Sequence, residues 1–186
     1  SRGLGDVYKR QVAVCENGNY YNRFYFVYPD GAVQHYDKKH LFTFGGEHKR
    51  FTAGTERVVV NFRGVRILLE VCYDLRFPVW ARNLGDYDMI LYVASWPTPR
   101  VDAWSALLRA RAIENQCYVA GVNRMGVDPA CEYSGGSAII DPYGKTIAEC
   151  PWSRESAVSA DIDMEALQAF RKKFPVLDDA DPFTLI

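Results

Sequence analysis

The stretch Val65-Arg66-Ile67-Leu68-Leu69-Glu70-Val71-Cys72 is a nearly continuous apolar run that ends at a thiol. A run of this kind is typical of a strand that is covered on both faces of a sheet. Tyr73 and Asp74 follow it and can begin a turn into a helix, which we expect over residues 74–84. The sequence therefore predicts a buried strand that leads into a helix, with Cys72 at the junction.

The segments on either side alternate between strand and helix patterns. Turn signals at Pro29-Asp30-Gly31 and at Asp141-Pro142-Tyr143-Gly144 separate pairs of strands. This alternation, together with the hairpins, predicts an α/β layered domain with a mixed sheet. Strands are expected at 12–15, 20–28, 33–36, 57–62, 89–94, 117–122, 137–140, 146–148 and 157–162, and further helices at 103–115 and 164–173.

The opening residues, 1–11, do not fit this pattern. They are polar, carry Arg2, Lys9 and Arg10, and show no period that would place them in a core. We therefore expect them to be a non-native or frayed leader. The domain itself is assigned to residues 12–186.

Composition excludes several classes of protein. With 48% hydrophobic and 24% charged residues in a chain of 186, one domain with a buried core is expected and disorder is not. Lys and Arg number 22 against 23 Asp and Glu, a balance that indicates neither nucleic acid nor an acidic membrane surface as partner. No apolar run approaches the roughly 20 residues that a membrane helix needs.

Cysteine usage points away from metal and toward free thiols. The five cysteines are Cys15, Cys72, Cys117, Cys131 and Cys150. None forms a CxxC pair, and the three histidines do not cluster with them, so we expect no metal site. An odd count in a chain with a sizeable core is typical of a reducing compartment, and a cytoplasmic location is expected.

Cys72 has two interpretations from its local context. A thiol between a strand and a helix can lie near the helix N-terminus, whose positive dipole end favours the thiolate. Alternatively, it is a small hydrophobe in the core, as free cysteines commonly are. The local sequence by itself slightly favours the core residue.

Three charged residues upstream of Cys72 likewise have both a functional and a non-functional interpretation. Lys38 or Lys39, beside a cysteine, would lower the thiol pKa from about 8.5 and donate to a developing oxyanion. Glu47 lies in a glycine-flanked loop. Taken one at a time, all three are better explained as solvated surface residues.

Taken together, five segments resemble the nitrilase superfamily of carbon–nitrogen hydrolases, and most closely its bacterial omega-amidase branch, the 2-oxoglutaramate amidases. Cys-Tyr-Asp-Leu-Arg-Phe-Pro is quite specific, and it follows the lysine element in the order that the family shows. The matching segments are 36–42, 46–54, 71–78, 92–97 and 109–116, and weaker likeness extends the match to about residues 20–183.

The resemblance implies an α-β-β-α sandwich that forms a homodimer or larger homo-oligomer through helix packing. It also implies a Glu–Lys–Cys triad with Cys72 as the nucleophile. Lys38 matches the family lysine, because that residue stands two positions before the histidine, and Lys39 does not. Glu47 matches a second glutamate that helps to hold the triad. The Lys38 ammonium and the backbone N–H of Tyr73 would stabilise the oxyanion, and no cofactor is needed.

One family residue has no counterpart in this sequence. The general-base glutamate of the family lies well upstream of the lysine element, and Glu16 does not match its position. The first strand and helix of the family fold are also unmatched. The sequence therefore resembles an N-terminally truncated member, whose activity as written is in doubt.

The function implied is hydrolysis of the terminal amide of a small ω-amido or 2-oxo acid, with release of ammonia. A nitrilase or an N-carbamoyl hydrolase would use the same triad, so these remain alternatives. A third alternative belongs to another class, a non-catalytic, oligomerising homologue or an inert fragment.

Pocket residues follow from the placement of the strands. Ser95 and Trp96 come directly after the buried strand at 89–94, and ligands collect at the carboxyl ends of strands in α/β sheets. We therefore expect Ser95 and Trp96 to bind substrate, with Trp96 forming a wall. Arg76 and Arg100 are candidates for a substrate carboxylate. Arg76 is alternatively a structural arginine paired with Asp74 or Glu114, and sequence reasoning favours that role.

Overall fold

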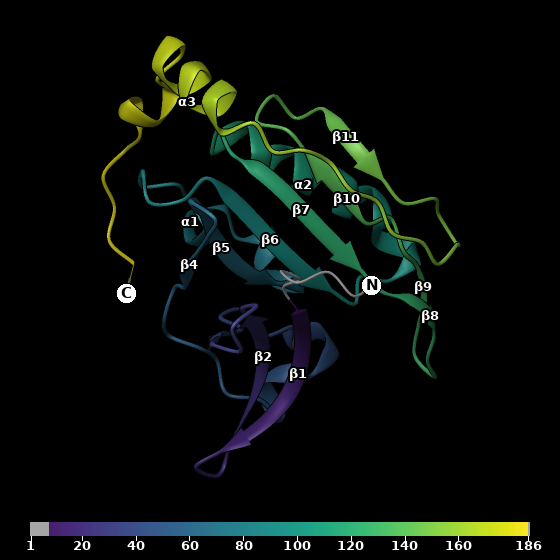
Figure 1. The fold of residues 1–186 in the computed structure, drawn as a ribbon. Coiled ribbons are helices and arrows are strands. Elements are labelled where there is room, and N and C mark those ends of the chain that lie inside the picture. The colour runs from purple at the N-terminus through teal and green to yellow at the C-terminus, as the bar shows by residue number, and fades with distance from the viewer. Residues whose placement is uncertain (1–7, 186) are drawn as a thin grey trace.

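A computed structural model describes residues 8–185, and the side chains from residue 12 onward. A six-stranded mixed sheet has the helix α2 on one face and a three-stranded antiparallel sheet on the other. Figure 1 shows the hairpin of β1 and β2 extending beyond the larger sheet. The expected mixed α/β architecture is confirmed.

The six-stranded sheet has the order β11-β10-β7-β6-β5-β4. Its three central strands, β5, β6 and β7, are parallel, and Val71 at the end of β5 lies beside Val93 of β6. The carboxyl ends of the central strands thus meet at one edge. The strands are β4 (Val59–Phe62), β5 (Val65–Val71), β6 (Met89–Ala94), β7 (Tyr118–Asn123), β10 (Ala138–Ile140) and β11 (Thr146–Glu149).

The remaining strands form two smaller sheets. The first comprises β1 (Tyr8–Glu16), β2 (Asn19–Val27) and β3 (Val33–Asp37). Strand β1 begins at Tyr8, four residues before the expected start, and residues 1–7 of the expected leader lie outside the described part of the chain. The second is a short hairpin of β8 (Met125–Val127) and β9 (Glu132–Ser134), which the sequence pattern did not reveal.

The core lies on both faces of β5. Leu68 belongs to the cluster under α2 (Val101–Glu114), where the predicted Trp104 and Leu108 are buried. Leu69 faces the opposite way and packs with Phe24 of the small sheet. This double burial explains why the strand reads as an almost unbroken apolar run.

The expected helix over residues 74–84 is wrong. The chain instead forms a 3₁₀ helix, η3 (Cys72–Arg76), and a single turn of α-helix, α1 (Pro78–Ala81). Pro78 lacks an N–H and disfavours helical geometry at the residue before it, and Phe77 has φ −117° and ψ 85°. Proline therefore divides the segment into two short pieces.

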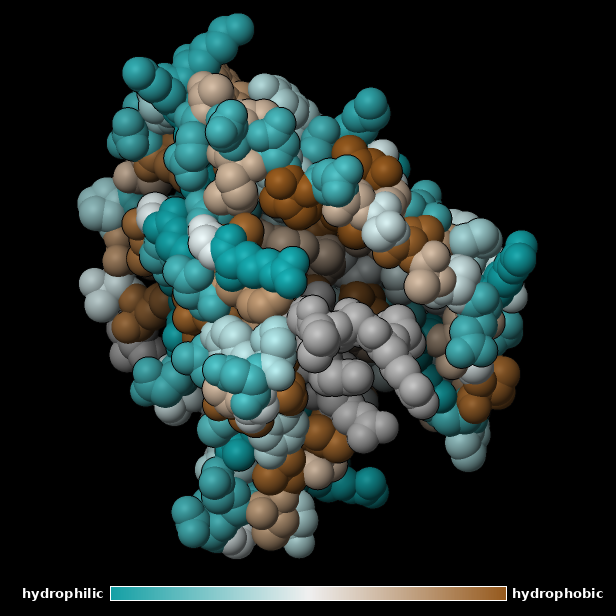
Figure 2. Space-filling model, in the orientation of Figure 1, coloured by the Kyte–Doolittle hydropathy of each residue, from teal (hydrophilic) through white to brown (hydrophobic). Residues whose placement is uncertain are grey.

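The expected strand over residues 157–162 is also wrong. The segment belongs to no ladder of the described residues, and Val158 is 39% exposed. The segment buries too little apolar surface to stabilise a further strand of the sheet. Instead it lines a hollow over β7 and β10, together with Val122 and Ile139. Figure 2 shows hydrophobic side chains at this face. The following helix α3 (Met164–Lys173) is confirmed, and η5 (Val176–Asp179) follows it.

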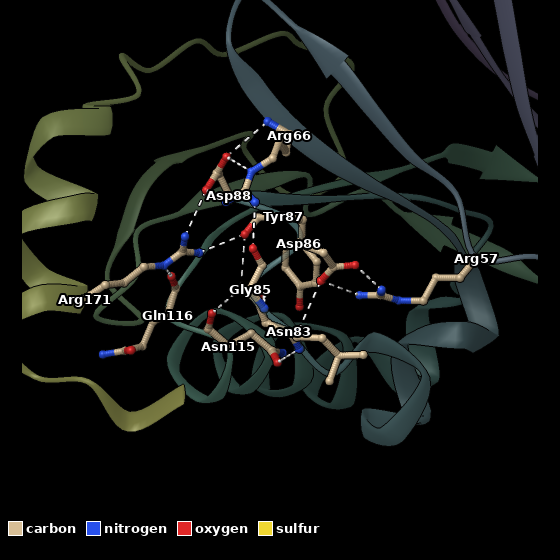
Figure 3. Close-up of polar contacts among 11 residues, drawn as sticks. Arg57, Arg66, Asn83, Gly85, Asp86, Tyr87, Asp88, Asn115, Gln116 and Arg171 are labelled. Atoms are coloured by element: carbon tan, nitrogen blue, oxygen red, sulfur yellow. Dashed lines mark hydrogen bonds and ion pairs between the residues drawn. The ribbon is translucent and has the colours of Figure 1, made fainter. Parts of the chain in front are cut away.

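Helix α3 is tied to the body of the protein through the start of β6. Asp88 pairs with Arg66 of β5 at 2.7 Å and with Arg171 of α3 at 2.9 Å, and Arg171 also donates to the carbonyl of Gln116 (Figure 3). These bonds satisfy a buried carboxylate and hold the C-terminal helix. No helix in the described part of the chain has the length and apolar character to cross a bilayer.

Glu70 is an exception within this core. It is fully buried on β5, and neither carboxyl oxygen has a hydrogen-bond partner among the described residues. Its neighbour on β6, Tyr92, also buries an unpartnered hydroxyl. Burial above all, and the nearby Asp74 charge, raise the pKa of Glu70 well above its ordinary value, although Arg57 and Arg111 oppose the shift. Burial therefore favours the protonated form of this carboxyl group.

This arrangement makes stability depend on pH. Because the pKa of Glu70 is raised in the folded state, its contribution to stability is complete below about pH 4.5 and is lost as the pH rises toward the folded-state pKa. We expect Glu70→Gln to match the wild type at low pH and to become more stable with rising pH, by up to ~1.4 kcal/mol per pH unit. Urea denaturation across pH 4–8 measures this.

The control is Glu149→Gln, which changes an exposed glutamate on β11. Its stability should follow the wild type at every pH. Parallel curves for Glu70→Gln and the wild type would contradict the assignment of a protonated Glu70.

Candidate active site

One pocket of about 200 Å³ opens where the chain leaves β3, β5 and β6. Every residue that the sequence assigned to the site lines the pocket, and so do Arg100, which the sequence offered as a candidate for a substrate carboxylate, and two residues that it did not reveal, Asn22 and Phe42. The assigned residues are Lys38, Glu47, Cys72, Tyr73, Arg76, Ser95 and Trp96.

Cys72 is the first residue after β5 and opens η3 with φ 48°. A residue with a Cβ in this left-handed region carries about 1–3 kcal/mol of strain, so the surroundings must hold it there. The thiol is half-buried, and its Sγ lies 3.9 Å from the carbonyl oxygen of Ser95. The sharp turn thus places the sulfur at the pocket, beside the end of β6.

Burial is the main cause of a raised pKa for the Cys72 thiol. The Lys38 charge and the contact with the Ser95 carbonyl lower the pKa, but Glu47 and Asp74 raise it further. The net shift of the thiol pKa is therefore upward, whereas a thiol at the N-terminus of a long helix is expected to have a lowered pKa. The resting group is therefore a thiol, and it needs a proton acceptor to become a nucleophile.

Lys38 and Glu47 form a short ion pair inside the pocket. Lys38 is 3% exposed, and its Nζ lies 2.6 Å from Oε2 of Glu47. The same oxygen accepts the N–H of Phe42 at 2.6 Å, and Oε1 accepts the Asn22 amide at 2.9 Å. Burial would raise the pKa of Glu47, but Lys38 and these donors together hold it below its ordinary value. Glu47 therefore stays ionised and fixes the ammonium at the site.

Only one of the two adjacent lysines lines the pocket. Lys38 does so, as predicted, whereas the Nζ of Lys39 lies 5.2 Å from the centroid of the Trp80 ring. Both residues follow the end of β3, so strand alternation is not the cause. The Lys39 N–H donates to the Tyr36 hydroxyl at 3.1 Å, which helps to hold the backbone at this position.

Asp74 connects the lysine segment to the cysteine turn. It is completely buried, and its Oδ1 accepts both the backbone N–H and the Nδ1 of His40, at 2.9 and 2.8 Å. Its Oδ2 accepts the Tyr36 hydroxyl at 2.8 Å and the N–H of Val71 at 3.0 Å. Four donors therefore occupy one carboxylate, which is what a buried charge requires.

Two aromatic contacts extend this network. The Tyr36 hydroxyl also accepts from the Trp80 indole at 3.2 Å. The His40 ring stacks on Phe77 with centroids 3.7 Å apart and planes within 4°.

Sequence reasoning missed the role of Asp74, because its partners lie up to 38 residues away. The only signal in the sequence is an acidic residue directly after a buried strand.

Trp96 forms a rigid wall, as expected. It is 3% exposed and packs against Trp104 with ring centroids 5.5 Å apart. Its backbone N–H donates to Oδ1 of Asn123 at 2.7 Å, and its indole donates to the carbonyl of Arg100 at 2.7 Å. Asn123, at the end of β7, was another residue that the sequence did not reveal.

The structural role for Arg76 that sequence reasoning favoured is wrong. Asp74 binds other donors, and Glu114 pairs with Arg111 at 2.8 Å. Arg76 is exposed at the pocket, with its guanidinium carbon 5.1 Å from the centroid of the Trp96 ring. Arg100 lies likewise over Phe42, at 5.4 Å.

The arrangement combines a thiol, a buried ammonium and two further cations in one small pocket. A thiol beside a fixed ammonium can form a covalent acyl intermediate and stabilise the oxyanion that precedes it. No three His, Cys, Asp or Glu side chains gather into a potential metal site within the described residues. Fold and site together define the class as a mixed α/β protein whose pocket combines a thiol with a buried ammonium.

Comparison with known families identifies the particular family. The model for the carbon–nitrogen hydrolase domain matches residues 4–172, and the protein belongs to this family. It is 53% identical to "Omega-amidase YafV" of Escherichia coli K12 over 94% of this chain and 68% of that protein. It is 41% identical to "2-oxoglutaramate amidase" of Bacillus subtilis over 90% of this chain and 66% of that protein. The chain thus spans about two thirds of the length of these relatives.

Solved structures agree. XC1258 from Xanthomonas campestris, a CN-hydrolase superfamily protein with an arsenic adduct in its active site, has a TM-score of 0.94 and 46% identity. The match covers 98% of this chain and 72% of that one. Nit3 of Saccharomyces cerevisiae, a member of the nitrilase superfamily, has a TM-score of 0.81 at 25% identity, over 89% and 62% of the two chains. The expected family fold is confirmed.

Asp74→Asn tests the network that joins the lysine segment to the cysteine turn. An amide at this position would turn its NH₂ toward a donor and lose at least one charge-assisted bond, so we expect a loss of about 3 kcal/mol in the free energy of unfolding. Urea denaturation measures the loss. The control is Asp128→Asn, whose carboxylate accepts the N–H groups of Ala130 and Cys131 in a surface turn. The free energy of unfolding of this control should hardly change. Equal losses in the two variants would contradict the central role of Asp74.

Proposed function

We propose that the protein is an amidase that hydrolyses the terminal amide of small ω-amido or 2-oxo acids through a thioester on Cys72. The observation that carries the proposal is that the Cys72 thiol and the Lys38 ammonium line one small pocket. The names of the relatives, omega-amidase and 2-oxoglutaramate amidase, support the reaction and the substrate class.

In the first half of the reaction, the Cys72 sulfur attacks the amide carbonyl. Lys38 and the backbone N–H of Tyr73 are suited to stabilise the oxyanion, because both residues line the pocket and Tyr73 directly follows Cys72. The C–N bond then breaks, the nitrogen takes a proton, and ammonia leaves a thioester. In the second half, water adds to the thioester and releases the acid and the free thiol.

The thiol proton needs an acceptor other than Glu47. Glu47 is the one carboxylate among the described residues of the pocket, and its pKa is held below its ordinary value, which makes it a weak base. Its bonds to Lys38 and Phe42 suit it to hold the ammonium in place. The family resemblance assigns the base to a glutamate upstream of the lysine segment, which no described residue matches.

The pocket favours a short, anionic substrate. Its volume of about 200 Å³ is below the 300–1,000 Å³ typical of sites for drug-sized ligands, and Trp96 closes one wall. Ser95 presents its carbonyl beside the thiol, and Arg76 adds a cation. A nitrile or an N-carbamoyl amino acid would meet the same thiol and lysine, so pocket size and charge distinguish the candidates.

We propose in addition a cytoplasmic location and a homodimer or larger homo-oligomer. All five cysteines are free, which suits a reducing compartment. Ile113 of α2 and Phe174 after α3 are 54% and 59% exposed, and apolar side chains of this kind suit helix packing between subunits.

Replacement of the nucleophile tests the proposed chemistry. In the full-length protein, Cys72→Ala should lower kcat for amide hydrolysis at least ~10³-fold while the far-UV circular dichroism spectrum is unchanged, because the positive φ strains both residues alike. The matched control is Cys131→Ala, a half-buried cysteine that does not line the pocket. Turnover retained in Cys72→Ala would remove Cys72 from the mechanism.

A substrate panel tests the substrate class. For the full-length protein, kcat/KM for 2-oxoglutaramate and succinamate should exceed that for aromatic nitriles and N-carbamoyl amino acids by at least about tenfold. The physical reason is that the small pocket excludes a bulky ring and its cations attract a carboxylate. Faster hydrolysis of the nitriles or carbamoyl compounds would exclude the proposed substrates.

A further inference from the structure

Arg100 is unusual among the less exposed arginines of this protein. The others that are buried or half-buried donate to carboxylates or to backbone carbonyls; Arg57 and Arg111, for example, pair with Asp86 and Glu114. The guanidinium of Arg100 is half-buried and makes no hydrogen bond or ion pair to any described residue. It lies in the wall of the pocket that contains Cys72.

A guanidinium in this state has lost part of its hydration without a protein partner in return. Partial burial of a charge is unfavourable unless hydrogen bonds replace the lost water. The guanidinium carbon lies over the Phe42 ring, 5.4 Å from its centroid, and this cation–π contact uses none of the N–H donors for a hydrogen bond. Guanidinium N–H groups of this kind can bind a carboxylate through two parallel hydrogen bonds.

The backbone beneath this side chain is held in place. The Arg100 carbonyl accepts the Trp96 indole at 2.7 Å, and its N–H donates to the carbonyl of Pro97 at 3.0 Å. Arg100 also ends η4 (Thr98–Arg100) and directly precedes α2, so two helical elements fix its position. A residue anchored in this way can bind a ligand with little loss of conformational freedom.

Arg76 differs from Arg100 in its surroundings. It follows Cys72 by only four residues on η3, and it is exposed to solvent. A solvated cation keeps its water and forms weaker, more strongly screened interactions than a partly buried one. Of the two arginines, Arg100 is therefore the better placed for a strong contact.

We propose that Arg100 is a specificity-determining residue that binds the substrate carboxylate at the end opposite to the scissile amide. This inference rests on the proposed amidase function. A substrate that lacks this carboxylate gains nothing from Arg100, so the residue selects ω-amido acids against neutral amides of the same length.

The test compares succinamate with butyramide, which has a methyl group in place of the carboxylate. In the full-length protein, Arg100→Leu should raise KM for succinamate about 10- to 100-fold, whereas its effect on kcat/KM for butyramide should be at least tenfold smaller. Arg100→Lys should recover part of the loss for succinamate. The matched control is Arg109→Leu, an exposed arginine of α2 outside the pocket, which should follow the wild type with both substrates.

Equal losses for both amides would assign Arg100 a structural role, and an unchanged KM for succinamate would place the carboxylate elsewhere; either result overturns the proposal. Binding of succinate, measured by calorimetry, separates this inference from the amidase function. Weaker binding to Arg100→Leu than to the wild type supports the inference even if neither amide is hydrolysed, in which case the proposed function alone fails. Equal succinate binding would overturn the inference.

Discussion

The candidate site depends on one buried carboxylate, that of Asp74. Three of its hydrogen bonds join Tyr36 of β3 and His40 after β3 to the turn after β5, and a fourth lies within that turn. One of these bonds holds the N–H of Val71, directly before the strained backbone of Cys72. Because the charge is completely buried, any separation of the two segments would leave it without partners, at high cost in free energy. Asp74 thus fixes the relative positions of the thiol and of the segment that carries Lys38.

Around this fixed point, the site divides electrostatic roles among its charged groups. Glu47 neutralises the buried Lys38 and keeps it in place, and the thiol pKa stays raised because burial outweighs the lysine charge. The nucleophile is therefore inactive until its proton is removed. Arg100, which lines the same pocket, has no counterion among the described residues and suits an anionic ligand. The resting thiol and the unpaired guanidinium leave this part of the site able to receive an anionic substrate.

The sequence predicted the elements whose pattern is local. The apolar strands and the helices at 101–114 and 164–173 follow from periodicity, and motif likeness placed Cys72, Lys38 and Glu47 in one pocket. The expected helix at 74–84 and strand at 157–162 were wrong, because Pro78 and high exposure override weak local patterns. The role of Asp74 and the free state of Arg76 could not be predicted, since each depends on which partners the fold brings near.

The measurement that tests the account most directly is mass spectrometry of the full-length protein, quenched in acid during turnover of succinamate. A thioester on the proposed nucleophile predicts that the peptide containing Cys72 gains the mass of the acyl group, and that peptides with Cys15, Cys117, Cys131 or Cys150 do not. Hydroxylamine should remove the added mass, because it cleaves thioesters. An acyl group on another residue would contradict the account. Rapid turnover in hydroxylamine-free buffer would also contradict it if no modified Cys72 can be found even when deacylation is slowed.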